Sequence, residues 1–258
     1  ANTKQTFPEY NRLVDRNGDI QIFLLFGMDN PNENWNPMVS RDINAETYRR
    51  TKMLLERNGF QSKVWATADL QKFTTDFRYG TPYVETLDRP AAHGHLVINM
   101  FFGPTSSPTS YAFAQFFNAA LSNAAVVIYS GHSGLGAYVS PTAFQVDYGV
   151  SMTPAKERYQ ILFFNSCSSY SYYNREFFAL KASALDPYGT KNLDIMANGL
   201  ATLFSSLTRA NFALLNGVIN WADLGRATSW QDIVLQADSG NLLSVNGDED
   251  NPVTPPGI

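Results

Sequence analysis

Short apolar runs alternate along this chain with segments of helical periodicity, and this alternation predicts the order of its elements. Runs typical of buried strands lie at Ile20–Phe26, Lys63–Ala66, Leu96–Phe102, Ala124–Tyr129, Tyr159–Phe164 and Leu193–Ala197. Helices are predicted over Asn44–Asn58, Tyr111–Leu121 and from Leu200 to about Leu214. Strands that alternate with helices are typical of an α/β fold with a mainly parallel sheet.

The length and composition of the chain fit one globular domain. Of its 258 residues, 44% are hydrophobic, 14% are aromatic and 16% are charged. This composition supports a large aromatic core and excludes a disordered chain or a coiled coil. We predict a single domain over residues 1–258 with its core at about 19–238. The segments 1–18 and 239–258 are polar and rich in turn residues, and we expect them to be peripheral.

Charge and cysteine content narrow the range of functions. Nineteen basic and 23 acidic residues give a net charge of −4 without any basic run, so neither nucleic acid nor an anionic membrane is an expected partner. The longest apolar stretch is too short to span a bilayer. The lone Cys167 excludes an intrachain disulfide and a cysteine-built zinc site. Few lysines and many Asn, Ser, Thr and Tyr residues favour a secreted or periplasmic protein.

Two of the predicted strands end in reactive residues. His132 follows the strand that ends at Tyr129, and Cys167 follows the strand that ends at Phe164. The carboxyl ends of neighbouring parallel strands meet at one edge of a sheet, so we expect both side chains there. An imidazole beside a thiol promotes the thiolate and can protonate a leaving amine. The pair therefore predicts a cysteine nucleophile, with backbone N–H groups of Cys167 and of Ser133 or Gly134 as an oxyanion hole.

The same residues resemble the signatures of a known group. Tyr129-Ser-Gly-His132 and Asn165-Ser-Cys167-Ser-Ser169 are similar to the two motifs of the caspase-like cysteine peptidases, which include caspases, metacaspases, clostripain and gingipains. In that family the histidine follows the third core strand and the cysteine the fourth. The resemblance covers residues 19–215 and implies a three-layer sandwich with a central sheet of about six strands. It also implies a Cys-His endopeptidase that acts on peptides or proteins through a thioester acyl-enzyme, without a cofactor.

Two positions depart from the family pattern. Metacaspases typically have glycine directly after the histidine, and its backbone N–H helps to bind the oxyanion. This chain has Ser133 there, whose N–H can donate a hydrogen bond to the oxyanion equally well. The residue two before the cysteine lines the pocket for the residue on the acyl side of the cut. Metacaspases, which cut after Arg or Lys, carry Asp there, whereas neutral Asn165 would select by hydrogen bonding. Many family members cleave themselves, and we expect such a cut in the turn-rich segment Lys181–Lys191, around Asp186–Gly189.

Other functions fit the sequence less well. A catalytically inactive binding module with the same fold is the main alternative, although inactive relatives usually lose the cysteine or the histidine. Gly-His-Ser also opens the nucleophile elbow of serine hydrolases, but Leu135 occupies the place of the last glycine and no histidine follows His132. A redox-sensing Cys167 would have no resolving cysteine in the chain.

Two histidines and three tyrosines have more than one interpretation. His93 and His95 could bind a metal together with His132, but they precede their strand and have no acidic residue close in sequence. A polar turn is therefore the preferred interpretation. The aromatic cluster after Cys167 could line a substrate groove, but a packing face of the following helix is favoured for it; its members are Tyr170, Tyr172 and Tyr173.

Two acidic segments raise the question of a structural calcium ion. Asp15–Asp19 has the alternating oxygen spacing of a calcium loop. Ile20 and Phe26 stand where such a loop has glycine and glutamate, so a solvated turn is favoured. Asp248–Asp250 is interpreted as a charged tail, with calcium as the alternative.

Overall fold

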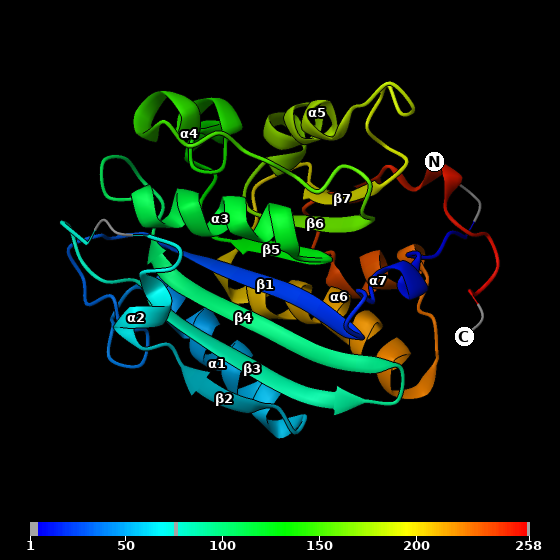
Figure 1. Ribbon diagram of the computed structural model, residues 1–258, viewed down its shortest axis with the longest axis horizontal. Helices are drawn as coiled ribbons and strands as arrows, with labels where there is room; N and C mark the ends of the chain where they lie inside the picture. The colour runs from blue at the N-terminus through cyan, green and yellow to red at the C-terminus, as the bar shows by residue number, and fades with distance from the viewer. Residues whose placement is uncertain (1–4, 75–76, 257–258) are drawn as a thin grey trace.

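The computed structural model describes residues 5–74 and 77–256. Within them, one sheet of eight strands has the order β2-β3-β4-β1-β5-β6-β7-β8 (Figure 1). The five strands from β4 to β7 in this order run parallel, whereas β2, β3 and β8 pair in antiparallel fashion. The predicted α/β fold with a mainly parallel sheet is thus confirmed, but the expected number of about six strands is too low.

The six strands predicted from apolar runs all form, and the two missed strands lie outside the parallel core. The strands are β1 Asp19–Met28, β2 Gln61–Val64, β3 Tyr83–Ala91, β4 Gly94–Pro104, β5 Val126–Ser130, β6 Gln160–Asn165, β7 Leu193–Asn198 and β8 Leu243–Asn246. β3 has no apolar run because polar residues interrupt it, among them the buried Glu85. Glu85 accepts a hydrogen bond from Tyr48 and pairs with Lys52 at 2.6 Å. β8 has only four residues, too few for a pattern.

Helices cover both faces of the sheet and make the fold three-layered (Figure 1). The α-helices are α1 Ile43–Arg57, α2 Thr67–Leu70, α3 Tyr111–Asn123, α4 Pro141–Tyr148, α5 Ser169–Lys181, α6 Phe204–Leu224 and α7 Trp230–Ala237. Ile22 and Leu24 of β1 face the core that contains α1, α6 and α7. Phe23 and Leu25 face the core that contains α3, α4 and α5. This alternation is what a strand buried on both faces requires.

The terminal segments are more deeply integrated than their polar sequences indicate. Tyr10 and Leu13 are fully buried in the core beside α6 and α7. The backbone N–H of Phe7 donates to the carbonyl of Pro252 at 2.9 Å, so the two segments also contact each other. The prediction that residues 1–18 and 239–258 are peripheral is therefore wrong for the described parts, because single large apolar residues anchor otherwise polar stretches.

The longest helix, α6, extends ten residues beyond its predicted end. The sequence prediction stopped before Gly217, a residue that weakens helices. A Cβ at this position would lie 2.9 Å from the Tyr10 hydroxyl, so the glycine allows the N-terminal segment to approach the helix. Gly225, with a φ of 64°, then ends α6 in the left-handed conformation that glycine favours. None of the described helices is both long and apolar enough to cross a membrane.

Candidate functional site

The candidate site lies at the carboxyl edge of the parallel strands. β5 and β6 are neighbours in parallel register, with Ser130 opposite Asn165. His132 and Cys167 each follow two residues later. The prediction that these residues leave adjacent parallel strands at the same edge is confirmed. The loops after β1 and β7 border the same place, because these strands flank β5 and β6 in the sheet.

Two buried tyrosines hold the backbone of the histidine loop. The Tyr129 hydroxyl donates to the carbonyl of His132, and the Tyr173 hydroxyl donates to the carbonyl of Ser133 at 3.0 Å. Burial raises the pKa of both tyrosines, so they stay protonated as donors. A Cβ on Gly131 would lie 2.9 Å from the Tyr129 hydroxyl. The Tyr-Ser-Gly-His sequence thus has a local structural reason: the tyrosine supports the loop and the glycine makes room for its hydroxyl.

The His132 side chain lies between an acid and an aromatic ring. Its Nε2 lies 2.9 Å from Oδ1 of Asp29, which directly follows β1. The Phe204 ring, from the first residue of α6, packs edge-on against the imidazole with 4.9 Å between ring centroids. The histidine keeps 38% of its side-chain surface exposed. The Asp29 contact engages Nε2, and Nδ1 has no hydrogen-bond partner among the described residues.

The Cys167 thiol contacts the loop after β7. The backbone N–H of Thr202 donates to Sγ at 3.5 Å, and the thiol donates to the carbonyl of Thr202 at 3.8 Å. Cys167 is half-buried. Thr202 and Phe204, which touch Cys167 and His132 respectively, are only two residues apart, so one short segment contacts both side chains. No hydrogen bond joins the thiol to the imidazole in the part of the chain that the structure describes.

Backbone strain is concentrated around this edge. Outside glycine, the described residues with a left-handed φ are Leu135 at 54°, Ser168 at 51° and Leu242 at 54°. Leu135 is three residues after His132, and Ser168 directly follows Cys167. Leu242 accepts a backbone hydrogen bond from Gly199, at the end of β7. Residues held in sparsely populated backbone conformations cluster at functional sites, which supports this edge as the candidate site.

The predicted oxyanion donors have no hydrogen-bond acceptor in the described part of the chain. The backbone N–H groups of Ser133, Gly134 and Cys167 donate no hydrogen bond to any described residue. Ordinary backbone groups in folded chains are almost always paired, so free N–H groups at a strained edge are suited to binding an oxygen of a ligand.

Asn165 has a different position from the one its motif suggests. Its side chain is fully buried, and Nδ2 donates to Oδ1 of Asn211 at 2.8 Å and to the carbonyl of Leu207 at 3.1 Å. The amide therefore holds α6 against β6 and offers no surface to a substrate in this conformation. The sequence could not anticipate this, because the partners lie more than 40 residues away.

The histidines before β4 are far from the candidate site. His95 lies between two carboxylates, with Nδ1 3.2 Å from Asp19 and Nε2 3.0 Å from Asp88. Asp19 begins β1, whereas His132 follows the opposite ends of the strands, about 30 Å away for a strand of ten residues. A metal site that joins His93, His95 and His132 is thus excluded by the fold. Among residues 5–74 and 77–256, no cluster of three His, Cys, Asp or Glu side chains could hold a metal ion.

The acidic segments form internal hydrogen bonds. Oδ1 of Asp15 accepts from the backbone N–H groups of Asn17 and Asp19, as in the favoured solvated turn. Asp248 is buried rather than part of a charged tail, and it accepts a hydrogen bond from the Thr6 hydroxyl at 2.6 Å. The tail interpretation is wrong for this residue, because the N-terminal segment covers it.

The tyrosines after Cys167 divide between the two interpretations. Tyr173 is buried in the core, in agreement with the favoured packing face. Tyr172 lines a surface groove, and Tyr170 is exposed.

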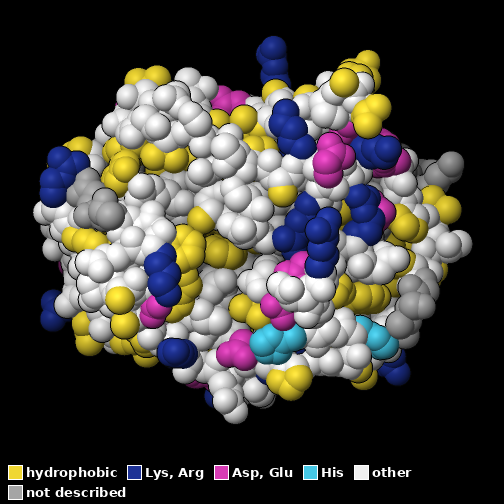
Figure 2. All heavy atoms as spheres, viewed as in Figure 1, with side chains coloured by type: hydrophobic (Ala, Val, Ile, Leu, Met, Phe, Trp, Pro, Cys, Tyr) yellow, Lys and Arg dark blue, Asp and Glu magenta, His cyan; other side chains and the backbone are white. Residues whose placement is uncertain are grey.

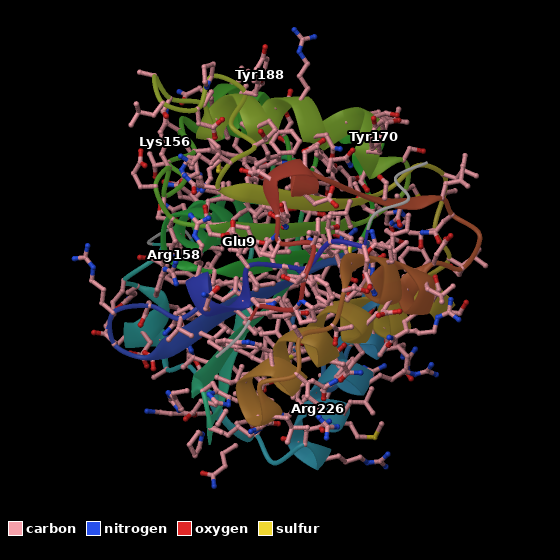
Figure 3. The ribbon with its side chains drawn as sticks, turned by 90° about the vertical axis from the view of Figure 1, so that its right-hand side faces the viewer. Glu9, Lys156, Arg158, Tyr170, Tyr188 and Arg226 are labelled. Atoms are coloured by element: carbon pink, nitrogen blue, oxygen red, sulfur yellow. The ribbon has the colours of Figure 1, made fainter. Side chains whose placement is uncertain are left out.

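The loop expected to be cut follows the far end of α5, a helix of 13 residues and thus about 20 Å long. Figure 3 labels Tyr170 in the first turn of this helix and Tyr188 in the loop beyond its last turn. Cys167 therefore cannot reach this loop in its own molecule.

Sequence reasoning missed three residues that contact the predicted pair: Asp29, Thr202 and Phe204. Asp29 had a recognisable signal, because it directly follows a predicted buried strand. Thr202 and Phe204 had no such signal in the sequence, since their contacts depend on how the loop after β7 turns back.

Comparison of the chain with protein-family models, with curated proteins and with solved structures finds no match.

Proposed function

We propose that this protein is a cysteine endopeptidase in which Cys167 is the nucleophile and His132 its acid–base partner. The observation that carries the proposal is the placement of both residues directly beyond adjacent parallel strands, in contact with one short segment at Thr202–Phe204. The resemblance to caspase-like peptidases points to the same pair. A caspase-like fold is part of this proposal, and the order of β4, β1, β5, β6 and β7 is compatible with it.

Asp29 is the third residue of the proposed site. A carboxylate 2.9 Å from Nε2 holds this nitrogen and so orients the imidazole ring. Nδ1 is then the nitrogen left to exchange a proton with the thiol. Because the thiolate is the nucleophile of cysteine peptidases, an imidazolium beside Cys167 is the state that the reaction requires. Asp29 acts through His132 and is thus a positioning residue.

The proposed reaction has two steps. The thiolate of Cys167 attacks the carbonyl carbon of the peptide bond, and the resulting oxyanion accepts hydrogen bonds from the N–H groups of Ser133 or Gly134 and Cys167. His132 gives its proton to the departing amine as the C–N bond breaks, which leaves a thioester. Water, deprotonated by His132, then hydrolyses the thioester and restores the thiol. Sγ must leave its contact with Thr202 when the substrate binds.

The proposal is tested by alkylation and by hydrolysis. We expect iodoacetamide to label Cys167, and the labelling rate to fall in a His132→Ala variant because the thiolate loses its partner. A peptide library should be cut by the unmodified protein and left intact by Cys167→Ala. His93→Ala is a matched control, since this histidine lies at the other edge of the sheet and should affect neither measurement.

Two outcomes would contradict the proposal. An unreactive Cys167 together with an uncut library would leave the inactive binding module as the better interpretation. Labelling that is equally fast in His132→Ala would show that the histidine does not activate the thiol, and the dyad would have to be abandoned.

A further inference from the structure

A groove opens beside the candidate site, between α4 and α5. It has a volume of about 550 Å³ and begins at the strained turn Leu135–Ala137. One wall is α5, which starts two residues after Cys167, and the other is α4. The groove therefore runs away from both proposed catalytic residues. Its size is within the range of about 300–1,000 Å³ that is usual for small ligand sites.

The lining of the groove combines apolar surface with negative charge. Leu135 and Val146 are 87% and 77% exposed, and Tyr172 adds a half-buried ring. Two carboxylates, Asp147 and Glu176, belong to the same lining, which contains no basic side chain. Figure 2 shows an acidic side chain at the boundary between the two helices, with hydrophobic side chains beneath α4.

The two carboxylates differ in how they are held. Oε2 of Glu176 accepts a hydrogen bond from the Ser140 hydroxyl at 3.1 Å, which ties α5 to the first turn of α4. The carboxylate of Asp147 is exposed and has no hydrogen-bond or ion-pair partner among the described residues. One acid is thus positioned and the other is free to pair with a cation. A lysine or arginine fits this lining, because its methylene groups can cover apolar surface while its charged end meets the acids.

The position of the acids sets their distance from the reacting bond. Glu176 lies seven residues after Ser169, the start of α5, which corresponds to about 10 Å along the helix. An extended peptide covers this length with about three residues. The part of the groove at Glu176 is therefore separate from the residues that directly flank the cut, and also separate from Asn165.

We propose that this groove is a substrate subsite that selects a basic side chain about three residues from the scissile bond. The inference rests on the proposed function, since it takes the occupant to be a peptide on which Cys167 acts. Apolar walls and a charged end make the subsite specific for a long cation, and an acidic side chain at the same position would be repelled.

Peptide sets that differ at one position test the inference. Lysine, norleucine and glutamate are placed in turn at each position within four residues of the cut. We expect lysine about three residues from the cut to raise kcat/KM about five-fold over norleucine, as for an exposed ion pair, and the gain to shrink at high salt. The gain should vanish in Asp147→Asn/Glu176→Gln and persist in Glu157→Gln/Glu249→Gln, which neutralises two exposed acids outside the groove.

A binding measurement separates this inference from the proposed function. Fluorescently labelled peptides are titrated against Cys167→Ala, which cannot cut them. Tighter binding of the lysine peptide that depends on Asp147 and Glu176 supports the groove, even if no peptide is ever hydrolysed. Equal binding of the lysine and norleucine peptides, or a preference that survives in Asp147→Asn/Glu176→Gln, overturns the groove while leaving the proposed peptidase untouched.

Discussion

The contact between Asp29 and His132 joins two partly exposed side chains on separate loops. More than half of the Asp29 side chain is exposed, so little besides the attraction between the two groups maintains the contact. Such a residue can be changed without disturbing the core. Its effect on the reaction can therefore be measured separately from its effect on folding.

We expect Asp29→Asn to lower kcat about ten-fold with little change in KM, because the imidazole loses the charge that orients it. Asp29→Glu should recover part of the loss, since it restores a carboxylate. The thermal midpoint should be the same in all three proteins. Steady-state kinetics and a thermal melt check this, and a variant with raised KM and unchanged kcat would assign Asp29 to substrate binding instead.

Gly131 and Tyr129 make a second prediction, about packing beneath the histidine loop. We expect Gly131→Ala to cost about 1–3 kcal/mol in the free energy of unfolding, because the new Cβ would lie 2.9 Å from the buried Tyr129 hydroxyl. The substitution should cost less in a Tyr129→Phe background, which lacks that hydroxyl, than in the unmodified protein, and urea unfolding of the four proteins measures both costs. An equal cost of Gly131→Ala in the two backgrounds would show that the clash is not the cause.

The helices and strands differ in how well their sequences predict them. β5 and β6 were predictable because strands buried on both faces give continuous apolar runs. β3 was not, since its buried Glu85 is tolerated only through Lys52 and Tyr48 from α1. The same distinction applies to the site. His132 and Cys167 follow from strand ends, whereas the role of Asn165 depends on α6, which lies far along the chain.

The tie between β6 and α6 distinguishes two roles for Asn165. We expect Asn165→Asp to destabilise the fold by about 3 kcal/mol at neutral pH, because a buried carboxylate would face two acceptor oxygens, of Asn211 and Leu207. Burial would raise the pKa of the new carboxyl, so the stability lost should return as the pH falls and the group becomes protonated.

Chemical unfolding of Asn165→Asp at pH 5 and pH 7.5 checks this expectation, with Asn174→Asp, on the half-buried part of α5, as the comparison. If Asn165 instead lines the substrate pocket, the opposite result is expected. In that case the aspartate variant would be as stable as the unmodified protein and would gain a preference for basic residues at the cut.

Asp194 links the sheet to both terminal segments of the molecule. It is fully buried on β7, and its Oδ2 accepts hydrogen bonds from Tyr159, from Trp230 of α7 at 3.2 Å and from Asn251 at 2.5 Å. Tyr159 in turn accepts from the backbone N–H of Glu9 at 3.3 Å. The other carboxylate oxygen of Asp194, Oδ1, has no hydrogen-bond partner among the described residues. Burial, with a smaller contribution from Asp248, raises the pKa of Asp194 to about 7.

This buried acid makes the stability of the whole molecule depend on pH. Below the unfolded value of 3.8, both states hold the proton and Asp194 adds no pH dependence. Between 3.8 and about 7 the unfolded chain releases the proton while the folded chain keeps it, so stability falls as the pH rises and then levels off above 7. The total change is on the order of a few kcal/mol.

We therefore expect the unfolding free energy of Asp194→Asn, relative to the unmodified protein, to improve steadily from pH 4.5 to pH 7, because asparagine does not ionise. Glu249→Gln, an exposed neutralisation close to the same segment, should show no such trend. Urea unfolding at four pH values checks both variants. Parallel curves for Asp194→Asn and the unmodified protein would mean that water or a rearranged Asn251 solvates the carboxylate. Ionisation of Asp194 would then not weaken the contacts that attach the terminal segments to the sheet.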